Sequence, residues 1–396
     1  MPIKLTRTIR MPDPFKMALY ERSPDLGPRV LFFSGGSALR EVSQSLIRYT
    51  HNSIHLITPF DSGGSSARLR DAFRMPAVGD VRNRLLALAD TSLLGHPEIL
   101  DLFSHRLSEK RSPSELAAEL DRLIAGHHYL IAPIPDPMRK IIRNHLFWFR
   151  RQMPPDFDLR KASIGNLILT AGYLQNRKHL DPVIYIFSKL VEVRGVVRPV
   201  VNTHLHLVSE LEDGQTLVGQ HLLTAKGLPP ISARVRRIYL SSRKRSPRPA
   251  GIGIRSKTRA LIESADLICY PFGSFYSSLV ANLLPEGVGA AIARVDCPKV
   301  FVPNTFEDPE QLGMSLEDQV NCLVEYLRRD DPGTIKPENV LNFVLLDRKN
   351  AAYPGTAKTS SFFRRAVQVI DTQLVTDRTR PKVDPLLLIE RLLSFT

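Results

Sequence analysis

The stretch that decides the fold reads Thr58-Pro-Phe-Asp-Ser-Gly-Gly-Ser-Ser-Ala-Arg-Leu-Arg70 and continues to Gly79-Asp-Val-Arg-Asn83. It follows the short apolar run 54–57, which has the length and composition of a buried strand. Glycine lets a backbone approach a ligand closely, and free N–H groups and hydroxyls suit phosphate oxygens. A strand that ends in such a turn therefore predicts an anion site. The structural alternative is a solvated turn before a helix N-terminus.

Charged side chains within this stretch limit the chemistry that it can support. Arg68 and Arg70 add positive charge, which suits phosphate oxygens. Asp61 would repel a phosphate unless a metal ion or a proton lay between the two groups. Asp80 and Arg82 repeat the combination of an acid and a base beside a glycine. The sequence therefore predicts a phosphate site with a candidate metal ligand at Asp61.

Other predicted strands end in the same kind of turn. Residues 29–33 lead into Ser34-Gly-Gly-Ser37, and residues 265–270 lead into Gly273-Ser274. A further strand ends just before Asn304. The carboxyl ends of parallel strands lie along one edge of an open sheet, which is where ligands bind in such folds. We therefore expect these turns to meet at one ligand site.

The alternation of predicted strands and helices indicates an α/β fold: a Rossmann-like parallel sheet flanked by helices, with a mostly helical insertion at about residues 96–160. Residues 1–28, rich in proline, form an N-terminal extension. Residues 29–330 form the main α/β domain. Residues 331–396 add a C-terminal strand and helices.

Three smaller predictions concern particular segments. An alternating pattern that turns at Asp213-Gly214 predicts a hairpin. Residues 340–346 have the composition of a last strand. Residues 362–374 and 385–395 have the spacing of closing helices.

Composition narrows the function classes. The 396 residues are 43% hydrophobic, enough for a large core, and no apolar run approaches the length of a membrane span. The N-terminus lacks the apolar segment of a secretory signal. The three cysteines have neither metal spacing nor a disulfide pattern, which favours the reducing cytoplasm. A net charge of +14 favours anionic partners, such as phosphorylated metabolites, nucleotides or nucleic acid.

Two features offer weaker alternatives. The basic, proline-containing loop 241–253 could contact nucleic acid, but no aromatic side chains interleave with it to stack on bases, so nucleic acid is the least favoured partner. His204 and His206 would share one face of a strand and could hold a metal. With no third ligand nearby in sequence, ordinary strand polarity is the preferred interpretation of this pair.

Taken together and in order, the motifs resemble the CofD-like superfamily over about residues 29–325. The matching segments are Ser34-Gly-Gly-Ser37, Asp61-Ser-Gly-Gly-Ser-Ser-Ala-Arg-Leu69, Gly79-Asp-Val-Arg-Asn83 with Ala87-Leu-Ala-Asp90, Gly165-Asn166, His206-Leu-Val-Ser-Glu-Leu-Glu-Asp-Gly214, Gly273-Ser-Phe-Tyr-Ser-Ser278 with Asn282-Leu-Leu284, and Val302-Pro-Asn304.

The resemblance implies one of two activities. One branch of the superfamily is the 2-phospho-L-lactate transferase, which moves a phospholactyl group from a guanosine-diphosphate-activated donor to a deazaflavin alcohol with Mg²⁺. The other is the YvcK-like gluconeogenesis-factor branch, which binds a uridine diphosphate sugar. The wording of the motifs is closer to the second branch. The chain departs from that branch at Ser62, where a second acid is usual, and at Ala162, where a histidine is common.

The resemblance makes transfer of a phosphorus-containing group from a nucleoside-diphosphate-activated donor to a hydroxyl acceptor the leading function. A non-catalytic nucleotide-sugar-binding regulator is the close alternative. The resemblance also implies a homodimer. In the transfer reaction Asp61 would hold Mg²⁺ or orient the acceptor hydroxyl, and Arg68 and Arg82 would neutralise phosphate oxygens.

The remaining predicted contacts to the phosphorylated ligand are glycine N–H groups, hydroxyls, an acid and amides. They are Gly35, Gly36, Ser37, Ser62, Gly63, Gly64, Ser65, Ser66, Asp80, Asn83, Asn166, Gly273, Ser274 and Asn304. For the three asparagines, helix capping or turn formation is the structural alternative.

Overall fold

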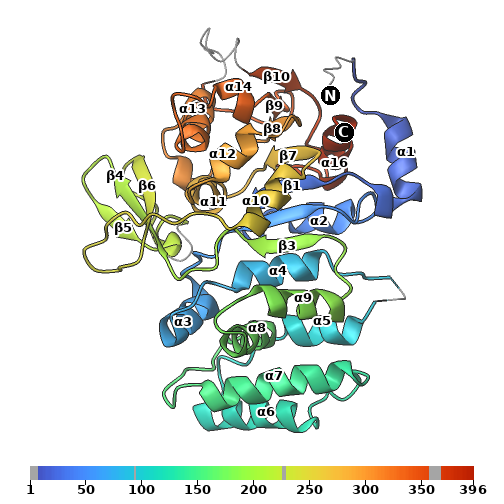
Figure 1. Ribbon diagram of the computed structural model, residues 1–396, viewed down its shortest axis with the longest axis vertical. Helices are drawn as coiled ribbons and strands as arrows, with labels where there is room; N and C mark the ends of the chain where they lie inside the picture. Colours follow the sequence, from blue (N-terminus) through green and yellow to red (C-terminus); the bar gives the residue numbers. More distant parts are fainter. Residues whose placement is uncertain (1–7, 93–94, 225–228, 356–366) are drawn as a thin grey trace.

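The computed structural model describes residues 8–92, 95–224, 229–355 and 367–396. Its centre is a seven-stranded sheet with the order β10-β9-β8-β7-β1-β2-β3, in which every strand pairing is parallel (Figure 1). The strands are β1 Val30–Ser34, β2 Ile54–Ile57, β3 Val196–Pro199, β7 Leu267–Tyr270, β8 Lys299–Phe301, β9 Phe343–Leu346 and β10 Gln368–Asp371. The predicted α/β fold with a parallel sheet is confirmed.

Helices cover both faces of the sheet, which is why β1 is apolar at successive positions rather than at alternate ones. Val30 and Phe32 pack with α2 and α16 on one face, while Leu31 and Phe33 pack with the other helices on the opposite face. The helices of the first face are α2 Arg40–Leu46 and α16 Pro385–Ser394. Those of the second are α10 Ser256–Glu263, α11 Ala281–Leu283, α12 Val288–Ala293, α13 Leu316–Arg328 and α14 Pro337–Val340.

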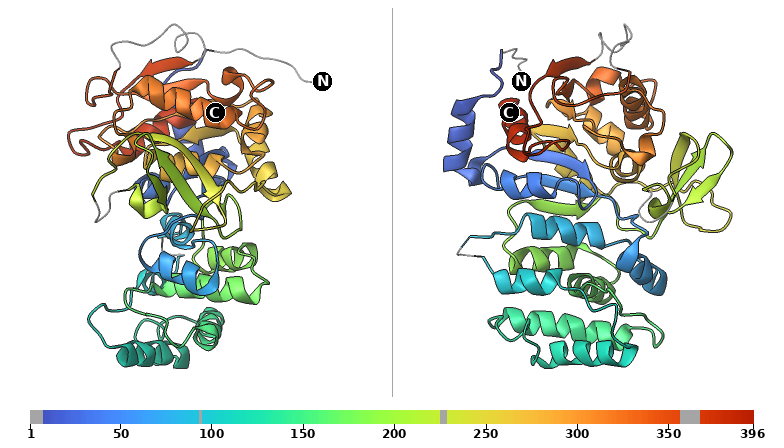
Figure 2. Two further views of the ribbon diagram at one scale, coloured as in Figure 1. Left: turned by 90° about the vertical axis from the view of Figure 1, so that its left-hand side faces the viewer. Right: turned by 180° about the vertical axis from the view of Figure 1, so that it is seen from behind.

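A helical region extends from the β3 side of the sheet (Figures 1 and 2). It has an apolar core of its own, which includes Leu85, Phe103, Leu120 and Phe149. Its helices are α3 Gly64–Phe73, α4 Gly79–Ala87, α5 Pro97–Ser104, α6 Pro113–Ala125, α7 Met138–Gln152, α8 Ile164–Gln175 and α9 Asp181–Leu190. Three of them, α5 to α7, account for the helical content that the sequence predicts for residues 96–160.

A small antiparallel sheet, in the order β5-β4-β6, projects from the side of the molecule (Figure 1). Its strands are β4 His206–Leu211, β5 Thr216–Val218 and β6 Val235–Ser241. The predicted hairpin is confirmed, and Gly214 takes the left-handed backbone conformation (φ 88°) that its turn requires. His204 Nδ1 lies 2.8 Å from the Met75 carbonyl oxygen, and burial lowers the pKa of His206 to about 4. Both imidazoles are therefore packed as structural groups.

The C-terminal segment corrects one prediction. Residues 368–371, expected within a helix over 362–374, form strand β10, which pairs in parallel with β9. Residues 362–366 lie outside the described part of the chain. An open sheet edge offers hydrogen bonds to Val369 and Ile370, and this tertiary pairing overrides the helical spacing. The closing helix predicted over 385–395 is confirmed as α16.

The N-terminal extension is anchored to that closing helix. It contains helix α1, Pro14–Arg22, which the sequence did not predict. The Asp13 backbone N–H donates to Ser394 Oγ at 2.9 Å, and Lys16 Nζ donates to the Ser394 carbonyl at 3.0 Å. Among the helices of the described segments, none combines the length and the apolar character that crossing a membrane requires.

Candidate functional site

Two of the predicted turns line one small cavity at the carboxyl edge of the sheet. The turn after β1 and the turn after β7 come from hydrogen-bonded neighbouring strands. Between them lies a cavity of about 30 Å³, lined by residues 33–38, 271–274 and 278–279. The structure therefore brings together five residues predicted to contact the ligand: Gly35, Gly36, Ser37, Gly273 and Ser274.

We call the turns after β1, β2 and β7 the first, second and third turns. The start of α4 joins the first turn to the second. A Cβ atom added at Gly36 would overlap the Asp80 carboxylate and lie 3.0 Å from Asn83 Nδ2. A Cβ atom added at Gly79 would lie 2.5 Å from Ser66 Oγ and 3.7 Å from Asp61 Oδ2. The backbone of the first turn thus packs against side chains of α4, and the first residue of α4 packs against side chains of the segment 61–66.

Asp61 shapes the loop that it begins. Its Oδ1 accepts a hydrogen bond from the Gly63 backbone N–H at 3.0 Å. Gly64 follows in the left-handed conformation (φ 52°) and begins α3, and a Cβ atom added there would have no neighbour within 4 Å. The start of α3 is therefore open to a ligand.

Ser65 is the meeting point of two donors. Asn166 Nδ2 donates to Ser65 Oγ at 3.2 Å, and Arg106 Nη1 donates to it at 3.4 Å. Asn166 is buried, and within the described residues its Oδ1 has no hydrogen-bond partner. A buried acceptor of this kind is costly unless a further donor or cation satisfies it. Asn166 thus lies beside the second turn, with its amide nitrogen bonded to Ser65 and its buried oxygen available to a further donor or cation.

Ser62 stands where the resemblance implies a second acid, and it makes a contact that the sequence did not suggest. Ser62 Oγ lies 2.7 Å from His221 Nδ1 and accepts from the His221 backbone N–H at 3.2 Å. The Ser62 hydroxyl thus contacts both the backbone N–H and the ring of His221. The contact ties the second turn to the segment after β5.

The third turn, which follows β7, is held by hydrogen bonds to the side chain of Asn304. Asn304 Oδ1 accepts from the Gly273 N–H at 2.9 Å, and its Nδ2 donates to the Gly273 carbonyl at 2.8 Å. The N–H of Gly273, which we expected to face a phosphate, is therefore engaged by the protein. The Asn304 side chain thus fixes the backbone of the turn at Gly273.

Two acids cap the helix that follows this turn, the π-helix η3 Phe275–Val280. Asp308 accepts from the Phe275 N–H, and Glu310 accepts from the N–H groups of Tyr276 and Ser277, each at 2.8 Å. Burial, together with the nearby Asp308 charge, raises the pKa of Glu310. Ser274 is thus presented to the cavity from a firmly capped helix.

The two predicted catalytic arginines point into protein. Arg68 forms an ion pair with Asp158 at 2.8 Å and donates to the backbone carbonyls of Asp158 and Arg160. Arg82 is buried and donates to Ser163 Oγ and Asn83 Oδ1. Neutralisation of phosphate charge by these two residues stays a prediction.

Two further arginines support the turns from inside. Arg70 is buried and donates to the carbonyls of Phe60 and Asp61. Arg84 is fully buried and donates to the carbonyls of Gly35, at 3.0 Å, and Leu39, at 2.8 Å. Burial lowers the pKa of both guanidinium groups to about 10. These cations hold the backbone of the first and second turns in place.

Sequence reasoning missed two exposed cations beside the site, Arg40 and Arg106. The pKa of Arg82 is lowered to about 10, mainly by burial, with the positive charges of Arg106 and Arg40 adding to the effect and Asp80 opposing it. Arg106 is placed beside the second turn by its hydrogen bond to Ser65, and Arg40 is placed beside the first turn as the first residue of α2. Arg40 could have been found, because it begins the helix after the first turn. Arg106 lies 41 residues from Ser65, and only the fold brings them together.

The side chains at the turns could bind Mg²⁺ only together with oxygen atoms of a bound ligand. Within the described residues no group of three or more His, Cys, Asp or Glu side chains forms a metal cage. Asp80 lies in the first turn of α4, and Asp61 Oδ2 would lie 3.7 Å from a Cβ atom at Gly79, the first residue of that helix. Mg²⁺ commonly binds through one or two carboxylates together with substrate phosphates. The residues present fit that mode, with Asp61 and Asp80 as the carboxylates.

Comparison with known proteins identifies the family to which the chain belongs. A family model described as 2-phospho-L-lactate transferase CofD matches residues 30–380. The gluconeogenesis factor of Bacillus subtilis (strain 168) is 28% identical over 301 residues, which cover 76% of this chain and 75% of the relative. A putative gluconeogenesis factor of Nostoc sp. is 27% identical over 298 residues, which cover 75% of this chain but only 52% of the relative.

A crystal structure of a UPF0052 family member from Bacillus halodurans has the same fold. It superposes with a TM-score of 0.62 at 22% identity, covering 93% of this chain and 99% of that one. The family model spans the parallel sheet, the helical region and every turn described above. The protein therefore belongs to the CofD family.

Proposed function

We propose that the protein binds a nucleoside-diphosphate-linked small molecule, with its diphosphate across the first and second turns. The observation that carries this proposal is the convergence of both turns on the start of α4, with the exposed Arg106 hydrogen-bonded to Ser65 and the exposed Arg40 at the start of the helix after the first turn. No side chain caps the N-terminus of α4, whose N–H groups and dipole favour an anion.

Binding without turnover, as a nucleotide-sugar-dependent regulator, is the form of this proposal that the geometry favours. Transfer of a phosphorus-containing group depends on cations that neutralise charge as it develops. Arg68 and Arg82 have their guanidinium groups engaged by protein atoms. The name of the two relatives above, gluconeogenesis factor, describes no transfer reaction.

Transfer is the second candidate, and the positions of Asp61 and Asp80 favour it. In that reaction the oxygen of an acceptor hydroxyl bonds to the phosphorus of the donor, the bond from that phosphorus to the nucleoside monophosphate oxygen breaks, and the hydroxyl proton leaves. Asp61 would orient the hydroxyl and accept the proton. Mg²⁺, when bound through the two carboxylates and the diphosphate, would offset the phosphate charge.

The first experiment measures ligand binding by calorimetry with guanosine, uridine and adenosine diphosphates and uridine diphosphate sugars, each with and without Mg²⁺. We expect one of these ligands to bind, and Arg106→Ala to weaken it about tenfold, since a hydrogen bond to a charged group contributes roughly 1.5–3 kcal/mol. The control is Arg150→Ala, which removes a cation of α7 that pairs with Asp121. Equal affinities in both variants would place the ligand elsewhere.

The second experiment separates the two candidates. Phosphorus NMR follows the donor in the presence of Mg²⁺ and a set of hydroxyl acceptors. For a regulator, the bound diphosphate stays intact and Asp61→Asn changes affinity only. Release of nucleoside monophosphate that requires Mg²⁺ and is lost in Asp61→Asn would establish transfer in its place.

A further inference from the structure

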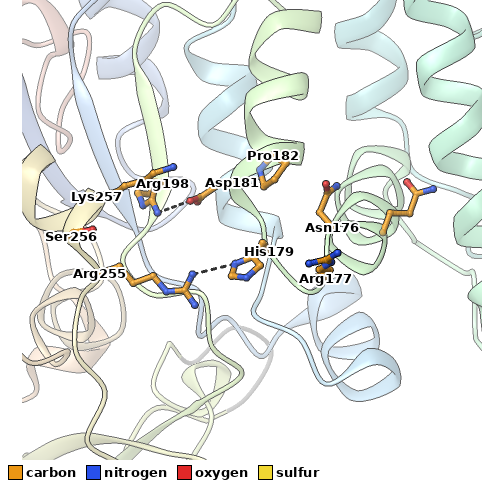
Figure 3. A pocket seen from close by; sticks show the side chains of 10 residues that line it. Asn176, Arg177, His179, Asp181, Pro182, Arg198, Arg255, Ser256 and Lys257 are labelled. Atoms are coloured by element: carbon orange, nitrogen blue, oxygen red, sulfur yellow. Dashed lines mark hydrogen bonds and ion pairs between the residues drawn. The ribbon is translucent and has the colours of Figure 1, made fainter.

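A second charged cavity lies at the β3 end of the sheet, apart from the residues of the turns. Its volume is about 510 Å³, within the range of small-molecule sites. It is formed by the connection between α8 and α9, by Arg198 on β3 and by the start of α10 (Figure 3). The lining residues are Gln175, Asn176, Arg177, His179, Asp181, Pro182, Arg198, Arg255, Ser256 and Lys257.

The charge of this cavity is strongly positive. Four of its side chains are arginine or lysine, and Asp181 is its one acid. That acid is already neutralised, because Arg198 Nη2 donates to Asp181 Oδ2 at 2.7 Å. Arg255 Nη1 donates to His179 Nδ1 at 3.2 Å, across the opening between α10 and the α8–α9 connection (Figure 3). The three exposed cations Arg177, Arg255 and Lys257 therefore have no carboxylate to balance them within the cavity.

The backbone at the rim is strained. Arg177 (φ 51°) and Lys178 (φ 62°) are consecutive residues in the left-handed conformation. That conformation costs a non-glycine residue roughly 1–2 kcal/mol, and such residues cluster at ligand sites. Glycine or asparagine would remove the strain, yet the chain has two long cationic side chains here. Of the two, Arg177 lines the cavity.

The start of α10 also favours an anion in the cavity. Arg255 is the N-cap residue of this eight-residue helix, and no side chain makes a capping hydrogen bond there. Its first N–H groups and its dipole favour an anion. The opposite wall carries His179, and Arg198 lies between the two walls. A ligand that contacts both walls needs negative charge at more than one point.

From these observations we propose that this cavity binds a small phosphorylated metabolite with at least two negative charges. Arg255 and Lys257 contact it from the α10 side, and Arg177 and His179 contact it from the other. Arg198 has a positioning role, because its hydrogen bonds to Asp181 and Thr258 join the two walls. The site is additional to the proposed diphosphate site at the turns.

The test uses inorganic pyrophosphate as the probe, in calorimetric titrations of the full chain at low salt. We expect the double variant Arg255→Ala/Lys257→Ala to weaken one binding event at least tenfold, and the charge-matched control Lys140→Ala/Arg150→Ala, on α7, to leave it unchanged. Pyrophosphate binding at the turns would be weakened by Arg106→Ala. Binding at the cavity of Arg255 and Lys257 should be unchanged in that variant.

Three results would overturn the proposal. They are the absence of pyrophosphate binding to the unaltered protein, equal weakening in the control variant, and loss of the same event in Arg106→Ala. Thermal unfolding of each variant checks that the fold is kept. Since the altered residues are exposed, apart from Arg150, which is half-buried, we expect unchanged midpoints.

Discussion

Ser62 Oγ and His221 Nδ1 lie 2.7 Å apart, although 159 residues separate them in the chain. The pair joins the loop after β2 to the segment after β5, so it connects the parallel sheet with the small antiparallel one. Ser62 occupies a position where the resemblance led us to expect an acid. A hydroxyl held by an imidazole replaces a negative charge there, which lowers repulsion toward a bound diphosphate.

A double-mutant cycle on Ser62→Ala and His221→Ala should give a coupling free energy of about 1 kcal/mol, because the two side chains share a direct hydrogen bond. Chemical unfolding of the four proteins measures it. Ser37→Ala, on an exposed serine of the first turn, serves as the control and should show no coupling to His221→Ala. Purely additive effects of Ser62→Ala and His221→Ala would show that the contact contributes nothing to stability.

Gly36→Ala should disrupt the site, because its Cβ atom would overlap the Asp80 carboxylate. We expect a loss of about 1–3 kcal/mol in stability and a loss of nucleotide binding. Gly63→Ala is the matched change in the second turn. Its Cβ atom would lie 3.4 Å from Asp61 Oδ1, an ordinary contact, and its φ of −103° suits alanine. Unfolding midpoints and calorimetry compare the two, and equal behaviour would contradict the packing argument.

Glu310→Leu should destabilise the protein by about 2–5 kcal/mol, since it leaves the buried N–H groups of Tyr276 and Ser277 without an acceptor. Glu310→Gln keeps one oxygen acceptor and should cost clearly less. Urea unfolding measures both variants, with Glu307→Gln, on an exposed neighbour, as the control. A larger loss in Glu310→Gln than in Glu310→Leu would mean that the amide cannot replace the carboxyl group.

Asp90 should make stability depend on acid pH. Its hydrogen bond with Arg194 lowers the pKa of Asp90 from 3.8 to about 2. A lowered pKa stabilises the folded state above the unfolded pKa, and this contribution disappears as the pH falls toward 2. At 1.36 kcal/mol per unit, the contribution is about 2 kcal/mol at neutral pH.

Unfolding of the unaltered protein and of Asp90→Asn at pH 7, 4 and 3 tests this dependence. The difference in unfolding free energy between them should be largest at pH 7 and shrink toward pH 3. Asp377→Asn, on a fully exposed side chain, should show no such difference. A constant difference for Asp90→Asn across the series would exclude titration of this carboxyl as its cause.

The sequence predicted the parallel sheet because strand runs and their turns are local signals. Residues 54–57 form the strand expected of them, and the turns at Gly35 and Gly273 line one cavity, which the loop after β2 does not line. Strand β10 was missed because its four residues become a strand only by pairing with β9. Local spacing does not contain that partner.

The direction of long side chains could not be predicted. Arg68 and Arg82 stand in the right motifs, but their guanidinium groups find Asp158 and Ser163, which belong to the helical region. Arg106 comes from the same region and reaches Ser65. Distant segments thus decide which cations face the ligand, and a motif fixes only the backbone that carries them.

The strand order has a consequence for how the chain is made. Strand β1 pairs on one side with β2, the next strand in the sequence, and on the other side with β7, which lies 237 residues later. At about 5–20 residues per second, a ribosome needs roughly ten seconds or more to synthesise the segment between them. During that time the β7-facing edge of β1 is unpaired, and an unpaired strand edge can pair with another chain, so any slowing of translation between β2 and β7 lengthens the period in which the nascent chain can aggregate.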